Sequence, residues 1–198
     1  MAKPRRPQPL LIRITHWINV PVLAILAMSG LQIFLAYPFF GPRGAQYDWV
    51  PLSGWMPPEW MRAGGWLAGA RHLHFAFAWL LVINAAIYLL YLAVSGEWRR
   101  RLLWRDQPRP HYNRLQRAAY TSALVLAILE VLSGLAMWKP IQLHRLTWLM
   151  GGFDAARVIH FLAMLGLAAF VIGHVVMVAV HWRTLPEMIT GGKREDQP

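Results

Sequence analysis

The chain has 198 residues, 57% of them hydrophobic, and carries 20 Lys and Arg against 9 Asp and Glu, a formal net charge of +11. Such a charge can indicate nucleic-acid binding, but here the basic residues lie between long apolar runs, which excludes that class and is typical of a membrane protein. The absence of cysteine excludes disulfides, thiolate-bound iron–sulfur clusters and covalently attached haem.

Four apolar runs are each long enough to cross a membrane as a helix, which takes about 20 residues. They contain no Lys or Arg, and Glu130, to which we assign no role, is their only acidic residue. The chain is therefore predicted to be an all-α integral membrane protein. We expect one domain over residues 1–198, built as a bundle of four transmembrane helices at 18–37, 73–94, 118–138 and 158–180.

The basic residues divide unevenly between the two faces of the membrane. Residues 1–17 carry four, the connection between the second and third runs carries seven, and residues 181–198 carry three, whereas the other two connections together carry six. The positive-inside rule then predicts cytoplasmic N and C termini, in a multi-pass protein of a bacterial inner membrane surrounded by lipid.

The first outer connection, residues 38–71, is long and periplasmic in this topology. It is rich in Pro and Gly and contains four tryptophans, Trp49, Trp55, Trp60 and Trp66. Because tryptophan favours the membrane interface, we expect this segment to lie along the outer surface. An interfacial belt and a docking platform for a partner are both open interpretations, and they are compatible.

The first and third runs share a short pattern. VLAILAMSGLQIF and LAILEVLSGLAMW both place Ser-Gly in the outer half of the helix, at Gly30 and Gly134. Glycine lets a backbone approach a neighbour or a flat cofactor closely, although small residues also serve ordinary helix packing in membranes. The pattern favours a bundle with two related halves, in which Gly30 and Gly134 are candidate cofactor contacts.

Two histidines interrupt the fourth run, VIHFLAMLGLAAFVIGHVVM. His160 and His174 are 14 residues apart, which on a helix is about 21 Å of rise and a difference of only about 40° in direction. They therefore project from nearly the same face at two depths of the membrane. Ionisable residues inside membrane spans are more often functional than those elsewhere.

The topology supplies a partner at each depth. His16 begins the first span at the inner side and is level with His174, and His74 begins the second span at the outer side, level with His160. Two level pairs of imidazoles inside a bundle are what two haems, each with two axial histidines, require. Zinc prefers four clustered ligands, and copper would lack a third ligand at each level.

The outer ligand of the second span has two candidates. His72 and His74 lie about 200° apart on a helix, so only one of them faces inward. Ala78 and Ala85 follow His74 at helical spacing and leave that face open for a planar ligand. This favours His74, and we expect His72 to lie in the interface.

Two arginines stand three residues before the outer histidines. Arg71 precedes His74 and Arg157 precedes His160, at the membrane edge where haem propionates would accept charge-assisted hydrogen bonds. Basic residues also decorate membrane edges without binding anything, but they are scarcer on the outer side. We therefore interpret Arg71 and Arg157 as candidate propionate ligands.

Five stretches resemble the di-haem b-type cytochrome subunits of nickel–iron hydrogenases and formate dehydrogenases, within the bacterial cytochrome b561 family. They are RITHW (Arg13–Trp17), RHLHFAFAW (Arg71–Trp79), HYNRLQR (His111–Arg117), SGLAMW (Ser133–Trp138) and IHFLAMLGLAAFVIGH (Ile159–His174). The resemblance implies that His16, His74, His160 and His174 ligate two b haems.

The resemblance also implies a quinone site near the inner haem, where Tyr112, Asn113 and Gln116 match the quinone-side loop. An amide can hydrogen-bond a quinone carbonyl, although Asn113 could equally cap the third helix. The long outer loop departs from the hydrogenase type. The pattern HFAFAWLLVINAAIYLLY is more similar to cytochromes that serve periplasmic molybdopterin oxidoreductases of the sulfite-oxidase type.

The sequence thus predicts a quinone-linked electron-transfer subunit. Electrons would move between a periplasmic redox partner, an outer haem, an inner haem and a quinone, with the direction open. A different hypothesis is a self-contained haem quinone oxidoreductase of the superoxide-oxidase type, which would act without a partner. A third is a transporter or scaffold whose histidines line a proton path.

Overall fold

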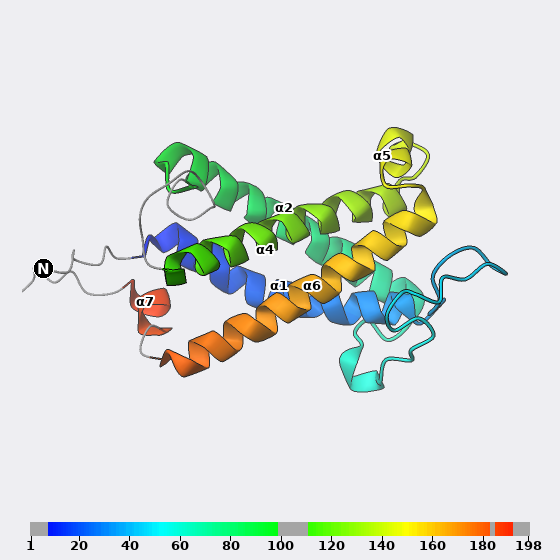
Figure 1. Ribbon diagram of the computed structural model, residues 1–198, viewed down its shortest axis with the longest axis horizontal. Coiled ribbons are helices and arrows are strands. Elements are labelled where there is room, and N and C mark those ends of the chain that lie inside the picture. The colour runs from blue at the N-terminus through cyan, green and yellow to red at the C-terminus, as the bar shows by residue number, and fades with distance from the viewer. Residues whose placement is uncertain (1–7, 99–110, 183–184, 192–198) are drawn as a thin grey trace, which may run out of the picture.

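The computed structural model describes residues 8–98, 111–182 and 185–191, and the described residues form helices and loops without a strand. The long helices are α1 (Leu10–Phe34), α2 (Leu67–Ser95), α4 (His111–Trp138) and α6 (Phe153–Val180). They run lengthwise through the molecule (Figure 1). The short helices are η1 (Glu59–Met61), α5 (His144–Leu149) and α7 (Leu185–Thr190).

All four long helices contain a stretch that is long and apolar enough to cross a membrane, with mean hydropathy between 1.7 and 2.4. The prediction of an all-α protein with four membrane-spanning helices is confirmed. Each helix begins several residues before its apolar run, because the hydrogen-bonded backbone extends beyond the apolar residues at that end. The last turn of α2 ends at Gly96, whose φ of 69° is the left-handed conformation that glycine adopts readily.

The four helices pack most closely as two antiparallel couples, α1 with α2 and α4 with α6. A buried amide joins the first couple. Asn84 of α2 is 3% exposed, and its Nδ2 donates to the carbonyl oxygen of Thr15 (2.9 Å) and to Oδ1 of Asn19 (2.7 Å) on α1. These bonds fix how α2 lies along the first half of α1.

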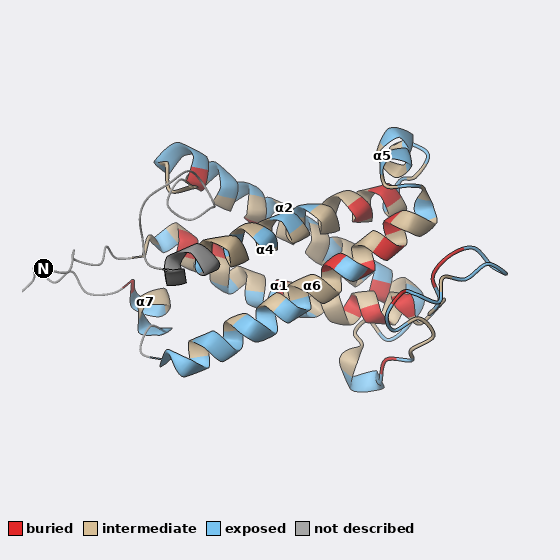
Figure 2. Ribbon diagram, viewed as in Figure 1, coloured by how far each residue is buried: buried red, intermediate tan, exposed pale blue. Residues whose placement is uncertain are grey.

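The end of the bundle that carries loop 38–66 and α5 is called the outer end below, and the opposite end the inner end (Figure 1). Most buried residues gather at the outer end, whereas α6 is largely exposed towards α7 (Figure 2). The core of the outer end is aromatic, since the Phe161 ring lies 5.2 Å from that of Phe34 and 4.9 Å from that of Phe40.

The outer loop is fastened to the helices by its backbone. The Ala63 amide donates to the carbonyl of Met28 on α1 (3.1 Å), and within the loop the Gly54 amide donates to that of Pro38 (2.6 Å). Three of its tryptophans point outward and are strongly exposed, Trp49 (68%), Trp60 (77%) and Trp66 (71%). This arrangement has the exposed indoles that an interfacial belt requires.

The two described termini meet at the inner end (Figure 1). The Gln8 amide donates to the carbonyl of Gly191 (2.9 Å), and Trp17 Nε1 on α1 donates to that of Met188 on α7 (3.0 Å). Arg13 Nη1 adds a bond to the Ile189 carbonyl (2.5 Å). The short α7 is thereby held along the first turns of α1.

Candidate functional site

Three helices bring four histidines together in two pairs, one near each end of the bundle. In the outer pair the rings of His74 on α2 and His160 on α6 have centres 6.2 Å apart, with planes inclined by 66°. In the inner pair His16 on α1 and His174 on α6 have centres 5.9 Å apart, inclined by 70°. All four side chains are intermediate in exposure.

The spacing within each pair fits one metal ion between two imidazoles. A metal–nitrogen bond of about 2 Å on each side, plus about 1.2 Å from each nitrogen to its ring centre, separates the ring centres by roughly 6.4 Å. The observed 6.2 and 5.9 Å lie close to this value. The donor set of each pair thus suits the bis-histidine ligation of a b haem.

Ser29 on α1 holds the ring of His74. Its Oγ lies 2.6 Å from the carbonyl oxygen of Ile25 and 3.0 Å from His74 Nδ1. The hydroxyl has a single proton, which it donates in the hydrogen bond to the Ile25 carbonyl. Ser29 therefore accepts a hydrogen bond from His74 Nδ1–H. The hydrogen-bond network therefore assigns the proton to Nδ1 and leaves the lone pair of His74 Nε2 available to a metal.

The other half of the molecule repeats this arrangement. Ser133 Oγ on α4 lies 2.5 Å from the carbonyl oxygen of Leu129 and 3.0 Å from His160 Nδ1. Ser133 likewise donates its proton to the Leu129 carbonyl and accepts from His160 Nδ1–H, so the lone pair of His160 Nε2 is available to a metal. Both outer histidines thus have the second hydrogen-bond partner that metal-binding histidines usually show.

The glycines that follow these serines lie against the histidine rings. A Cβ atom built on Gly30 would be 3.4 Å from His74 Cε1, and one on Gly134 would be 3.4 Å from His160 Cε1. A methyl group would just touch the ring, and a longer side chain would overlap it. The sequence predicts Gly30 and Gly134 as candidate cofactor contacts. In the structure both leave room for the imidazole itself, and contact with a cofactor stays a prediction.

A carboxyl group approaches one outer histidine alone. Glu130 Oε2 on α4 lies 2.8 Å from His160 Nδ1, and the Glu130 backbone carbonyl lies 3.1 Å from the same nitrogen. The Glu130 side chain is 14% exposed, and its second oxygen, Oε1, is buried without a hydrogen-bond partner. The imidazole of His160 is thus in a more polar environment than its apolar helix suggests.

The inner pair is surrounded by aromatic rings. Trp17 lies edge-on to His16, with ring centres 5.5 Å apart, and Phe170 stacks on His174 at 6.0 Å with planes inclined by 11°. Phe170 stands one helical turn before His174 on α6, so its ring covers the neighbouring face of the imidazole. The inner pair is positioned by ring contacts, whereas the outer pair is positioned by hydrogen bonds.

The structure separates the two candidates at the start of α2. His72 is exposed, whereas His74 is half-buried against His160 and Ser29. The two residues point to different faces of the helix, as their spacing predicts. The preference for His74 over His72 agrees with this placement, and its role as a ligand stays a prediction.

The two candidate propionate ligands differ in their surroundings. Arg157 Nη2 donates to the Tyr37 carbonyl (2.5 Å), and its guanidinium lies 5.1 Å from the centre of the Tyr37 ring and 5.4 Å from that of Phe40. Arg71 is exposed and lies 5.9 Å from the centre of the Phe75 ring. Both stand at the outer end beside the outer histidines, and binding of propionates stays a prediction.

Of the two candidate quinone contacts, the side chain of Asn113 lies outside the described residues. Gln116 is exposed at the inner end of α4, where its Nε2 donates to the hydroxyl of Tyr120 (2.9 Å) one turn later. The amide oxygen of Gln116 can accept a further hydrogen bond. Gln116 thus shares the inner end of the bundle with His16 and His174.

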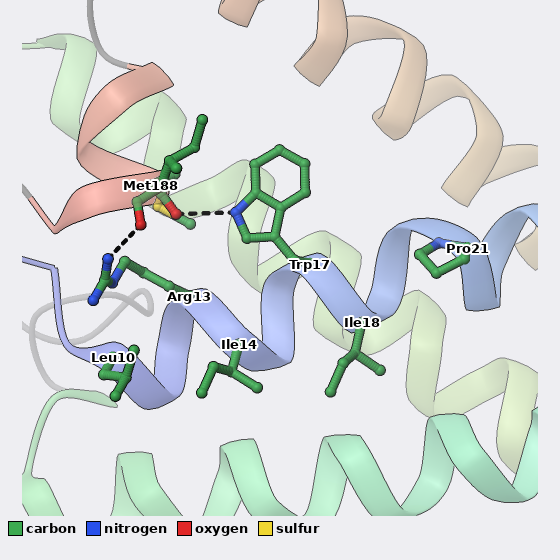
Figure 3. Close-up of a pocket in the computed structure, with 8 residues that line it drawn as sticks. Leu10, Arg13, Ile14, Trp17, Ile18, Pro21 and Met188 are labelled. Carbon is green, nitrogen blue, oxygen red and sulfur yellow. Dashed lines mark hydrogen bonds between the residues drawn. The ribbon is translucent and has the colours of Figure 1, made fainter.

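An apolar groove of about 700 Å³ runs along α1 at the inner end, where α7 forms one of its walls (Figure 3). Trp17 lies between the groove and the inner pair, since its indole both lines the groove and contacts His16. The lining residues are Leu10, Arg13, Ile14, Trp17, Ile18, Pro21, Met188 and Ile189.

Four polar residues of the site were not assigned a role from the sequence, namely Ser29, Ser133, Glu130 and Asn84. The sequence could have indicated a shared role for the two serines, because both precede the repeated glycine and thus occupy equivalent helix positions. Glu130 had the signal of an acid inside a span. Asn84 stands in a helix of ordinary apolar composition, and only its cross-helix hydrogen bonds reveal it.

A multi-pass helical membrane chain with histidine pairs between its helices has the architecture of a membrane cytochrome b. The chain matches the prokaryotic cytochrome b561 family over residues 8–191 and belongs to it. It is therefore a bacterial inner-membrane protein that transports electrons through haem b.

One relative covers nearly the whole chain. Over 201 residues the chain is 41% identical to a protein of Azospira oryzae that is provisionally named protein-methionine-sulfoxide reductase subunit YedZ1. The alignment covers 92% of this chain and 95% of the relative. No solved structure matches the chain.

Proposed function

We propose that the chain is a di-haem electron-transfer subunit, in which His74 and His160 ligate an outer haem and His16 and His174 an inner one. The observation that carries this proposal is the contact of each outer histidine with a serine, at 3.0 Å between Nδ1 and Oγ. Each serine donates its own proton to a backbone carbonyl and accepts from an Nδ1–H group, which on His160 is shared with the carboxyl of Glu130. The lone pair of each Nε2 is thereby left for iron.

When bound, each haem supplies an iron that accepts and releases one electron at a time. The chain holds the two irons at separate levels, since 14 residues of α6 correspond to about 21 Å of rise. Arg71 and Arg157 are proposed to meet propionates at the outer level through charge-assisted hydrogen bonds. The protein's part is therefore to bind, space and tune the haems.

The proposed orientation places both termini and the inner end in the cytoplasm. The support is the excess of basic residues in the segments that border this end. The outer haem would then face the periplasm. We propose that quinone reacts at the inner end, with Asn113 and Gln116 as hydrogen-bond partners for its carbonyl oxygens.

The proposed partner is a periplasmic oxidoreductase that reduces methionine sulfoxide in proteins. The support is the name of the Azospira oryzae relative, together with the outer loop and its exposed tryptophans. Reduction of a sulfoxide to a thioether consumes two electrons and two protons and releases water. A quinol oxidised at the inner end would supply both electrons through the two haems in turn.

The test is a reconstitution of the purified chain in liposomes. A short-chain quinol should reduce the haems, and a periplasmic oxidoreductase that copurifies with the chain should reoxidise them only when protein-bound methionine sulfoxide is added. Haems that the quinol does not reduce would contradict the quinone link. Rapid turnover of superoxide by the chain with quinone alone would favour the self-contained oxidoreductase instead.

A further inference from the structure

Glu130 is an acid within a membrane-spanning helix, with a side chain that is 14% exposed, and the electron path described above does not use it. Burial of a carboxyl group among apolar helices is costly unless the group finds a partner. Among the described residues, the partner of Glu130 is His160, through the 2.8 Å contact between Oε2 and Nδ1. The carboxyl group of Glu130 thus contacts one proposed axial ligand, His160.

The related halves of the molecule provide an internal comparison. Three residues before Ser29, which holds His74, stands Leu26; three residues before Ser133, which holds His160, stands Glu130. The serines and glycines are the same in both halves, so among these three positions the carboxyl group is the difference between them. It cannot be needed to orient an imidazole, because His74 is oriented without one.

A carboxylate that accepts the Nδ1–H bond increases the electron-donating power of an imidazole. A stronger donor on the iron stabilises the ferric state over the ferrous state and lowers the reduction potential of a haem. The serine hydroxyl on His74 is a neutral acceptor and has a weaker effect of the same sign. The two axial ligands of the outer haem are therefore unequal.

We propose that Glu130 acts through His160 to lower the reduction potential of the outer haem and leaves that of the inner haem unchanged. The inference rests on the proposed haem ligation. A lower potential at the outer haem makes an electron leave it more readily towards an acceptor outside. Glu130 would thus make the reduced outer haem a stronger electron donor and a poorer store of electrons.

The experiment is a spectroelectrochemical titration of the purified, haem-loaded chain. The wild type should show two b-haem components, and His174→Ala, which removes a proposed inner ligand, identifies the outer one. Glu130→Gln keeps the shape and an acceptor oxygen but removes the charge. It should raise the reduction equilibrium constant of the outer haem about tenfold, which is ~59 mV for one electron, and leave the inner component in place.

Two further variants keep the result interpretable. Glu130→Leu copies the position of Leu26 and should raise the potential at least as much as Glu130→Gln. Glu130→Asp retains the charge and should stay closer to the wild type. The absorption spectrum should remain that of a six-coordinate low-spin haem in Glu130→Gln, which shows that His160 is still bound while the potential has moved.

Two wild-type b-haem components with an outer potential that Glu130→Gln does not change would overturn this inference alone. Equal movement of both components would also overturn it, since it would indicate a general loss of structure. A wild-type protein without two b-haem components would overturn the haem ligation and this inference together.

Discussion

The two ends of the bundle hold a histidine pair in different ways. At the outer end, serines hold the rings of His74 and His160 by hydrogen bonds and glycines leave room for them, and most buried residues of the described chain lie nearby. At the inner end, His16 and His174 contact Trp17 and Phe170, and the helices around them are more exposed (Figure 2).

The difference supports the proposal that the two haems have different tasks. A rigid hydrogen-bonded site keeps its potential and geometry fixed, as transfer to a docked protein requires. A more open site suits an exchangeable molecule that must enter and leave through the lipid. The comparison is therefore consistent with a protein partner at the outer end and quinone at the inner end.

The largest effect is expected from bulk at the glycines of the outer pair. Gly30→Leu and Gly134→Leu each place carbon atoms where the imidazole ring lies, so one haem should be lost while the inner one remains. Gly30→Ala should be tolerated, because its methyl group would only touch His74 at 3.4 Å. Haem content per chain is the measurement, and Gly173→Leu, with no atom within 4 Å of its Cβ, is the matched control.

Asn84→Leu tests how much the hydrogen bonds between α1 and α2 stabilise the inner half of the bundle. The substitution removes the bonds to the Thr15 carbonyl and to Asn19 and leaves buried polar groups without partners. The free energy of unfolding should fall by about 1–3 kcal/mol, as measured by thermal denaturation in detergent. Because Thr15 adjoins His16, the inner haem should be released first on heating. Simultaneous release of both haems would contradict the separate holding of the two ends.

The two serines of the outer pair should not be equivalent. Ser29→Ala removes a hydrogen bond that His74 Nδ1–H donates, and should destabilise the ferric outer haem by about 0.5–1.5 kcal/mol. Ser133→Ala should have a smaller effect, since Glu130 still accepts from His160. The midpoint potential of the outer haem measures both. A larger shift for Ser133→Ala would contradict the partner assignment at His160.

The smallest effect is expected at the junction of α1 and α7. Trp17→Phe keeps an aromatic ring beside His16 but removes the donor to the Met188 carbonyl. The exposed bond should contribute roughly 0.5 kcal/mol, so haem content should be unchanged. Faster proteolysis of residues 185–191 is the expected readout, and an unchanged digestion rate would show that other contacts hold α7.

The four membrane helices could be predicted from the sequence because lipid imposes a long apolar run on each of them. Their first turns could not, since residues such as Asp154 and Arg157 continue the helix without an apolar signal. The position of each histidine along the bundle axis could also be predicted, because the rise per residue of a helix converts residue spacing into distance along the axis.

The partners of the histidines were harder to predict. The contact of Ser29 with His74 depends on the rotation of α1 about its own axis and on its register against α2, and neither is encoded in one local pattern. The Ser-Gly repeat indicated that the halves were related but not what the serines bind. Glu130 stood out by charge, yet its partner lies 30 residues away on another helix.

The haem content of five histidine variants tests the central claim most directly. Two haem b per chain are expected in the wild type and in His72→Ala, whose histidine is exposed. One haem should be lost in each of His74→Ala, His160→Ala, His16→Ala and His174→Ala, and the reduced spectrum should lose the same component within each pair. Retention of both haems by His160→Ala, or loss of one by His72→Ala, would contradict the proposed ligation.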